Sequence, residues 1–183
     1  MATAEALLTA EEYRLLPDNG QPTELVRGRV VTLNIPAPRH GQICVTIGYL
    51  LRRHFETSDL GHVVSNDSAV ITEHGPDTVR GPDVAFYSYQ RVPKGPLPRG
   101  YLQAAPELVF EVRSPGDRWS KILAKVAEFL EAGVKVACVL DDQTQTLTVY
   151  REDQSPVELA ADDEFTLPEI LGDFRVKVQR FFG

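Results

Sequence analysis

Cysteine is scarce in this sequence, and no spacing typical of zinc ligands is present. The 183 residues include two cysteines, too few for a scaffold held together by disulfides. Cys44 lies in an apolar pattern typical of a helix and Cys138 in one typical of a strand. Both are expected to be buried, reduced thiols. No group of cysteines and histidines has the spacing of a zinc site.

Long apolar segments are also absent. No apolar run approaches the roughly 20 residues that a membrane-spanning helix needs. Residues 1–8 lack the basic start and apolar stretch of a signal peptide. We therefore expect a cytoplasmic protein with no membrane partner. The composition, 43% apolar and 25% charged, is typical of a globular protein and favours a single domain over residues 1–183 that needs no structural metal to fold.

The sequence has no excess of basic residues. Its net charge is −7, which argues against a protein that coats nucleic acid constitutively. The acidity is concentrated near the C-terminus, where residues 141–183 hold 10 acidic and 4 basic side chains. The totals therefore leave room for a local basic groove elsewhere in the chain.

The first half of the chain alternates short helix and strand patterns. Thr9 and Glu12 form a capping box. It opens a short helix that ends before Pro17, since proline disrupts a helix interior. The patterns that follow predict two strands over 24–31 with a turn at Arg27-Gly28, a helix over about 40–56, and a strand pattern over 62–71 that residues 65–68 interrupt.

The second half predicts a strand–helix–strand unit between hairpins. We expect strands over 83–87, 107–112 and 134–140, a helix over about 118–132, a hairpin strand over 145–150, and short strands near 157, 165 and 175–178. A Pro- and Gly-rich loop over residues 92–106 is of a length that is often functional. Strand–helix–strand implies a parallel pair, and the hairpins imply antiparallel neighbours. The predicted class is α/β (α+β), a mixed β-sheet flanked by helices.

Two acidic residues lie where catalysis is plausible. Asp83 begins a strand after Pro82, and Glu111 lies late in an apolar strand. A buried carboxylate is costly unless it is paired or bound to a metal. Carboxylates from adjacent strands, with one backbone carbonyl such as that of Val112, match the oxygen ligands that Mg²⁺ prefers.

A lysine on the predicted helix over 118–132 completes this pattern. Lys125 falls just outside the apolar stripe of the helix, whereas Lys121, one turn earlier, lies further toward solvent. Lys125 could therefore reach along the sheet. A lysine beside a metal can hold or deprotonate the attacking water and offset charge on a phosphate.

Each of these residues also has a purely structural interpretation. Asp83 could cap a turn, and Glu111 could be a buried acid paired with Arg113 or Lys125. Lys125 could be a flanking lysine whose stem covers apolar surface. Glu24 could be a solvated residue that opens a hairpin, and His40 could cap or line the second helix.

An ordered set of segments is similar to the Uma2-like family of restriction-endonuclease-like proteins, formerly a domain of unknown function, in the PD-(D/E)XK superfamily. The resemblance spans about residues 8 to 180. PD…ExK alone is a weak motif, but the ordered set is specific to the family. The similar segments are 24–30 (ELVRGRV), the helix entry at Pro38 and His40, 81–86 (GPDVAF), 106–115 (PELVFEVRSP) and 125–134 (KVAEFLEAGV).

The resemblance implies a restriction-endonuclease-like core with Mg²⁺ (or Mn²⁺) bound by Asp83 and Glu111, and an accessory acid at Glu24. This sequence departs from the motif at Arg113, where lysine is expected. Arginine stays protonated at neutral pH and cannot act as a base, but it can bind phosphate. The family lysine looks relocated to the following helix, which fits Lys125.

Three functions fit these observations. The first is a Mg²⁺-dependent DNA endonuclease, in which Asp83, Glu111, Lys125 and Glu24 are catalytic and Asp83, Glu111 and Val112 hold the metal. Arg113, His40 and Lys121 would then bind substrate. The second is a non-catalytic descendant that binds nucleic acid or protein, and the third is a hydrolase of small phosphoesters. Cutting both strands of a duplex favours a homodimer, for which the apolar C-terminal strands could supply the surface.

Overall fold

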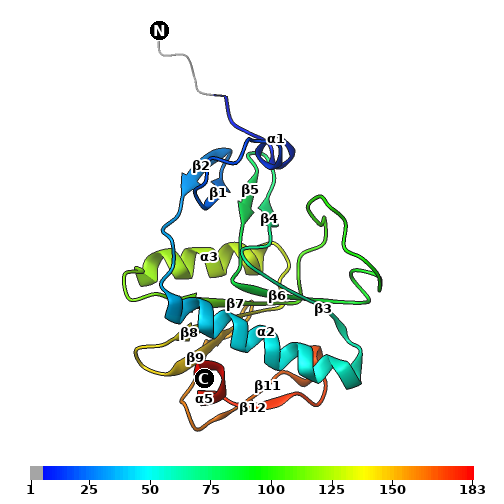
Figure 1. The fold of residues 1–183 in the computed structure, drawn as a ribbon, viewed down its shortest axis with the longest axis vertical. Helices are drawn as coiled ribbons and strands as arrows, with labels where there is room; N and C mark the ends of the chain where they lie inside the picture. The colour runs from blue at the N-terminus through cyan, green and yellow to red at the C-terminus, as the bar shows by residue number, and fades with distance from the viewer. Residues whose placement is uncertain (1–5) are drawn as a thin grey trace.

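The structure, a computed structural model, describes residues 6–183. Residues 1–5, part of the stretch in which the sequence predicts no signal peptide, lie outside that range. The described chain is mixed α+β, with two main sheets and helices packed against them (Figure 1). This confirms the fold class predicted from the sequence.

A six-stranded sheet forms the centre of the molecule. Its order is β10-β9-β8-β7-β6-β3, and neighbours are antiparallel except for the parallel pair β7–β8. The helix α3 (Trp119–Glu131) connects this parallel pair, as the predicted strand–helix–strand unit requires. The strands are β3 (Gly61–Ser65), β6 (Val84–Ser88), β7 (Leu108–Arg113), β8 (Val136–Asp141), β9 (Thr146–Tyr150) and β10 (Val157–Leu159).

A second sheet of four strands lies at the upper end of the molecule in Figure 1. Its order is β2-β1-β5-β4, and α1 (Ala10–Arg14) packs on it. The capping box predicted at the start of α1 is confirmed, because Thr9 and Glu12 each accept the other's backbone N–H. The strands are β1 (Thr23–Val26), β2 (Arg29–Thr32), β4 (Val70–Glu73) and β5 (Thr78–Arg80).

The predicted strand pattern over residues 62–71 is in fact two strands in different sheets. β3 ends at Ser65 in the large sheet, and β4 begins at Val70 in the small one. Between them Asn66 and Asp67 both have positive φ, at 64° and 53°, a conformation that redirects the chain. Strand β5 was not expected from the sequence. The change of sheet was hidden because both strands carry short runs of apolar residues.

Helices cover both faces of the large sheet. On one face lies α2 (Pro38–Ser58), whose buried residues recur at helical spacing and pack on alternate residues of β7. On the other lies α3, which packs around Val109. Because side chains alternate along a strand, Glu111 points to the α3 face, as Val109 does. The α2-side contacts come from Ile43, Ile47, Leu51, Phe55, Leu108, Phe110 and Val112.

The C-terminal segment closes the α2 side of the core. It contains β11 (Glu164–Thr166), α4 (Pro168–Leu171), β12 (Arg175–Lys177) and α5 (Gln179–Phe182), and β11 pairs with β12. Its large apolar side chains, including Phe165 and Phe181, are fully buried within the chain. The chain's own core therefore uses Phe165 of β11, whereas Val157 of β10 is 50% exposed.

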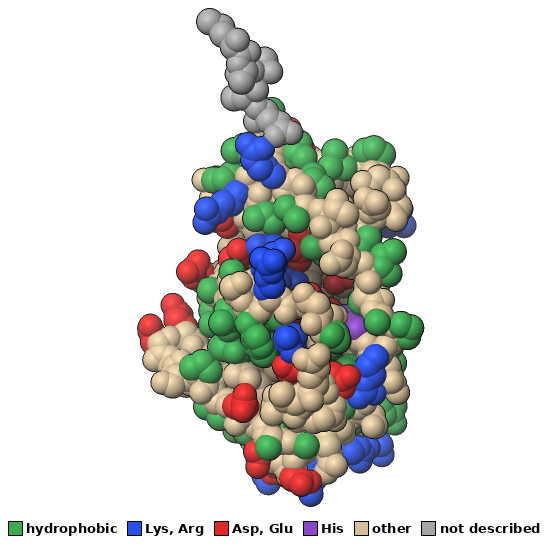
Figure 2. All heavy atoms as spheres, turned by 90° about the vertical axis from the view of Figure 1, so that its left-hand side faces the viewer, with side chains coloured by type: hydrophobic (Ala, Val, Ile, Leu, Met, Phe, Trp, Pro, Cys, Tyr) green, Lys and Arg blue, Asp and Glu red, His purple; other side chains and the backbone are tan. Residues whose placement is uncertain are grey.

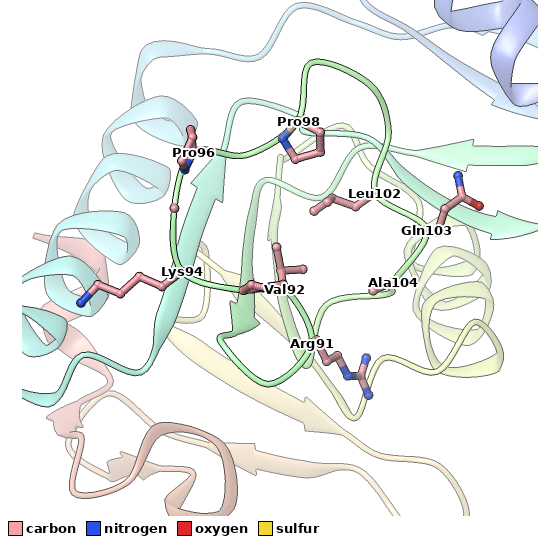
Figure 3. Close-up of a pocket in the computed structure, with 10 residues that line it drawn as sticks. Arg91, Val92, Lys94, Pro96, Pro98, Leu102, Gln103 and Ala104 are labelled. Atoms are coloured by element: carbon pink, nitrogen blue, oxygen red, sulfur yellow. The ribbon is translucent and has the colours of Figure 1, made fainter.

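The loop over residues 92–106 covers the large sheet beside α3. Val92, Leu97 and Leu102 pack on the α3-side core. An open cavity of about 500 Å³ lies within the loop, lined by residues between Arg91 and Ala104 (Figure 3). None of the site residues predicted from the sequence lines this cavity. Among the described residues, no helix is both long enough and apolar enough to cross a membrane.

Candidate active site

Asp83 joins the start of β6 to the end of β7. The ladder between these strands ends at Val84 and Phe110. Beyond this last pair β6 no longer pairs with β7, and the Asp83 carboxylate binds the free backbone of β7 instead. Its Oδ2 accepts the N–H of Val112 at 2.6 Å, and its Oδ1 lies 2.9 Å from Nε2 of His40. The side chain is 12% exposed. Asp83 is therefore fixed in place while still open to solvent on one side.

The same contact shows where the Val112 carbonyl points. The N–H and C=O of one strand residue project to the same side of the strand. Since the Val112 N–H faces Asp83, its carbonyl also faces that side, past the point where the β6 ladder has ended. The carbonyl is therefore on the correct side of β7 to join Asp83 as an oxygen ligand.

Glu111 and Lys125 meet across the interface of β7 and α3. Lys125 Nζ donates to Glu111 Oε2 at 3.0 Å and to the Gly81 carbonyl at 2.7 Å. Lys125 is part-buried while Lys121 is exposed, as the helix pattern predicts. The structure thus brings the ammonium group of Lys125 beside the acid that follows the PD motif.

Glu24 reaches this cluster from the four-stranded sheet. Its Oε1 accepts the Gly81 N–H at 3.0 Å and lies 3.2 Å from Lys125 Nζ, and its Oε2 accepts from Arg80 at 2.8 Å. Arg80 also pairs with Glu128 of α3. Glu24 is buried rather than solvated. In this structure it holds Lys125 and the Gly81 backbone in place.

Glu111 has an oxygen with no partner. Oε1 is buried and makes no hydrogen bond with the described residues. A buried unpaired polar atom is costly, and an anionic oxygen beside a second carboxylate is a ligand for a hard divalent cation. The carboxylates of Asp83 and Glu111 with the Val112 carbonyl make an oxygen-only donor set. These residues fit Mg²⁺ or Mn²⁺.

The electrostatics of the cluster follow from burial and charge. Burial raises the pKa of Glu111 above its ordinary value, against the opposing effect of Lys125. A further cation beside this group would favour its carboxylate form. Burial also acts to raise the pKa of Glu24, but Lys125, the Gly81 N–H and Arg80 bring it below its ordinary value.

His40 lies at the α2 side of the site. It is in the first turn of α2, four residues before Cys44. The hydrogen bond with Asp83, and then the interaction with Cys44, raise the pKa of His40 to about 10. Its other nitrogen, Nδ1, lies 3.3 Å from the hydroxyl of Ser114. At neutral pH His40 is therefore an imidazolium that pairs with the Asp83 carboxylate.

Arg113 lies next to the cluster, but its guanidinium already has partners. Nη1 donates to Asp141 at 2.8 Å and to Gln143 at 3.2 Å, and the guanidinium carbon lies 5.2 Å from the centre of the Trp119 ring. Its Nε is buried with no hydrogen-bond partner among the described residues. Glu111 therefore pairs with Lys125, and Arg113 pairs with an acid of β8.

Three residues of this region were missed from the sequence. Cys44 lies beside His40 and Asp83. The H-x-x-x-C spacing on a helix could have indicated that Cys44 lies next to His40. Asp67 flanks the PD turn, where a Cβ on Gly81 would come within 2.7 Å of the Cβ of Asp67. Arg80 immediately precedes Gly81. Its pairing with Glu24 depends on the second sheet, so no local pattern marks it.

Cys44 is only part-buried, whereas Cys138 is fully buried. The expectation of a buried thiol therefore holds for Cys138 and not fully for Cys44.

Figure 2 shows the molecule from the left-hand side of Figure 1. Acidic, basic and histidine side chains surround a hollow in the middle of this face. The four-stranded sheet lies above that region and the six-stranded sheet below it.

Known proteins resemble this chain in sequence pattern and in fold. The model of the Uma2 family, described as "Putative restriction endonuclease", matches residues 10–179. A crystal structure described as a putative nuclease belonging to DUF820, from Anabaena variabilis ATCC 29413, has a TM-score of 0.82 at 19% identity. The match covers 96% of this chain and 97% of that one. At this identity the likeness establishes the fold. No curated protein matches the chain.

Proposed function

Because this chain belongs to the Uma2 family, we propose that it is a metal-dependent endonuclease that hydrolyses phosphodiester bonds of DNA. The observation that carries the proposal is the unpartnered Oε1 of Glu111. This oxygen lies near the end of β7, where Asp83 binds the Val112 N–H and Lys125 binds the other oxygen of Glu111. Family and fold support a nuclease-type function, and the site chemistry supports the choice of metal.

We assign the metal ligands to Asp83, Glu111 and the carbonyl of Val112, and the ion to Mg²⁺ or Mn²⁺. When bound, such an ion polarises the phosphoryl group and favours formation of the nucleophile from water. The protein supplies the geometry: Asp83 is fixed by the Val112 N–H and by His40. Glu111 is fixed through its other oxygen by Lys125, which leaves Oε1 available.

Lys125 supplies the positive charge of the site. Its ammonium group lies within hydrogen-bond distance of Glu111 and of the Gly81 carbonyl, so it can orient the attacking water and offset charge on the phosphate. Glu24 positions this ammonium group, since its own carboxylate is occupied by Arg80, Gly81 and Lys125.

DNA would approach the exposed side of the cluster. Lys121 is exposed one turn before Lys125 and would contact the DNA backbone. His40 would contact a phosphate next to Asp83. Arg113 would do so only after exchanging its bond with Asp141, or through its free Nε. A homodimer would present two such sites, one for each strand of a duplex.

Cleavage of supercoiled plasmid DNA in Mg²⁺ or Mn²⁺ tests the proposal. Wild-type protein is expected to nick or linearise the plasmid, and chelation of the metal is expected to stop the reaction. Asp83→Ala and Glu111→Gln should each lower the rate at least about 100-fold, the range of losses seen when a main catalytic electrostatic contact is removed. Glu131→Gln, an exposed acid at the end of α3, should cleave at the wild-type rate.

The same samples separate this function from the non-catalytic alternative. Titration calorimetry should detect one Mg²⁺ or Mn²⁺ site per chain in the wild type and none in Asp83→Ala. A wild-type protein that neither binds these ions nor cleaves DNA would refute the nuclease assignment and favour a binding descendant of the fold. Sedimentation of the same protein measures whether the expected homodimer forms.

A further inference from the structure

Cys44 lies beside the candidate active site but has no part in the proposed function. It follows His40 by four residues in α2, and residues at this spacing share one face of a helix. Asp83 approaches the same face from the start of β6. His40, Cys44 and Asp83 each offer one ligand atom, and these atoms all lie within 4.8 Å of one another. All three residues are part-buried, so an ion can reach them from solvent.

The size of this cluster is close to that of a tetrahedral zinc site. With Zn–N of about 2.0–2.1 Å and Zn–S of about 2.3 Å, neighbouring ligand atoms lie about 3.3–3.6 Å apart. His40 Nε2 is 2.9 Å from Asp83 Oδ1, slightly closer than that, and no two of the three ligand atoms are more than 4.8 Å apart. Small rotations of three side chains would therefore close the ligand set.

We propose that His40, Cys44 and Asp83 form a binding site for a thiophilic divalent ion, Zn²⁺ above all. Imidazole, thiolate and carboxylate are the ligand types that zinc takes in proteins, whereas Mg²⁺ takes oxygen ligands. The donor set thus differs from the oxygen-only set of Asp83, Glu111 and Val112. Zinc binding releases the protons of the thiol and the imidazole, because both must be deprotonated to ligate. A water molecule would complete the coordination.

Asp83 belongs to both donor sets, which has a functional consequence. A carboxylate that ligates Zn²⁺ together with His40 and Cys44 is drawn toward α2 and away from Glu111. Zinc would therefore compete with Mg²⁺ and inhibit cleavage. This consequence rests on the proposed function, but the zinc site itself does not.

Titration of the metal-free, full-length protein with Co²⁺ tests the site directly. Cobalt replaces zinc in such sites, and a cysteine thiolate bound to it gives a charge-transfer band in the near ultraviolet. We expect this band in the wild type and its loss when Zn²⁺ is added. Cys44→Ser should abolish the band and weaken Zn²⁺ binding about 100-fold or more, since loss of a partner outside the ligand set already costs 10–100-fold.

The second cysteine provides the matched control. Cys138→Ala removes a fully buried thiol and should keep the band. If Cys44→Ser does not fold, as judged by circular dichroism, the wild type provides a second measurement: Zn²⁺ should protect Cys44 from alkylation, as mapped by mass spectrometry. A wild type without the band, a band that survives Cys44→Ser, or alkylation of Cys44 that Zn²⁺ does not slow would overturn the proposal.

Plasmid cleavage separates the two proposals. Micromolar Zn²⁺ added to a Mg²⁺ reaction should inhibit the wild type, and Cys44→Ser should be at least about tenfold less sensitive, in line with its weaker zinc binding. A cobalt band without any cleavage supports the zinc site and refutes the nuclease. Cleavage without a cobalt band supports the nuclease and refutes the zinc site.

Discussion

Lys125 is the residue on which the charge balance of the site depends. Its ammonium group lies within 3.2 Å of the carboxylates of both Glu24 and Glu111, and these acids are mostly removed from water. Such a lysine has its pKa raised, because the two acids and Asp83 together outweigh the effect of burial. Lys125 therefore stays charged at neutral pH and serves as a fixed cation, and it would need large changes around it to act as a base.

Replacing this cation should destabilise the protein. Lys125→Met would leave Glu24 and Glu111 without their shared partner, and breaking a buried ion pair by removing one member costs about 3–5 kcal/mol. Urea denaturation of wild type and variant measures the difference in the free energy of unfolding. Lys121→Met, an exposed lysine one turn earlier, should change it by less than about 0.5 kcal/mol. Equal effects of the two variants would contradict the buried pairing.

Arg113 has a partner that its position in the sequence motif does not predict. The sequence places it two positions after Glu111, on the same face of β7, at the lysine position of the PD…ExK pattern. The structure pairs it with Asp141 of the neighbouring parallel strand. This partner is set by the register between β7 and β8. No pattern near Arg113 in the sequence indicates that register.

At the scale of elements, the turn between β4 and β5 anchors α1. The Asp77 carboxylate accepts the N–H of Ala10 at 2.7 Å, and its second oxygen accepts the N–H of Gly75 at 3.3 Å. An acid near the first residues of a helix satisfies a donor that has no partner within the helix. The hydrogen bond from Ala10 is the main cause that lowers the pKa of Asp77.

Asp77→Ala should make stability less dependent on acid pH. The variant should lose about 1.5–3 kcal/mol at pH 7, the usual range for hydrogen bonds to a charged group. Because the folded-state pKa of Asp77 is below its ordinary value of 3.8, its contribution is complete above that value and is lost as the pH falls through the folded pKa. The difference from wild type should therefore shrink below about pH 4. Urea denaturation at pH 7 and at pH 3 measures it.

An exposed acid controls for general charge effects in that experiment. Glu152→Ala, in the turn after β9, should leave stability within about 0.5 kcal/mol of wild type at both pH values. A deficit of Asp77→Ala that stays constant down to pH 3 would contradict the role given to the charged carboxylate.

At the scale of the whole molecule, the candidate site is the place where several layers meet. Glu24 comes from the four-stranded sheet, Asp83 and Glu111 from the six-stranded sheet, Lys125 from α3 and His40 from α2. The core beneath these layers holds them in place. In that core Phe181 of α5 contacts the rings of Phe110 and Phe165, with ring centres 6.0 and 5.5 Å away.

Truncating Phe181 tests whether the C-terminus belongs to this core. Phe181→Ala should lower the free energy of unfolding by about 3–5 kcal/mol, the range for a buried phenylalanine. Tyr49→Ala removes an aromatic side chain that is 56% exposed on α2 and should cost about 1 kcal/mol or less. Chemical denaturation measures both. A loss for Phe181→Ala as small as that for Tyr49→Ala would mean that α5 is not part of the core.

The sequence by itself determined the local features. The capping box of α1, the β7–α3–β8 unit and the relative burial of Lys125 and Lys121 follow from helix and strand geometry. The apolar stripe of α3 was predicted only in part: Ile122, Val126 and Phe129 are buried. Trp119 and Leu123, which the same spacing placed in the stripe, are exposed. The strand patterns also singled out Asp83 and Glu111. The resemblance to the family implied that they bind a metal, and this role is a proposal for the cleavage and binding measurements.

Tertiary structure alone decided which distant residues meet. The second sheet, the change of sheet at Asn66 and Asp67, and the pairing of Glu24 with Arg80 depend on contacts between residues far apart in the chain. So does the position of Cys44 beside Asp83. For Lys125 and Asp83, the sequence indicated residues that could reach a site. Only the packing of α3 and α2 on opposite faces of the sheet brought them to one strand end, because side-chain partners are set by how whole elements pack together.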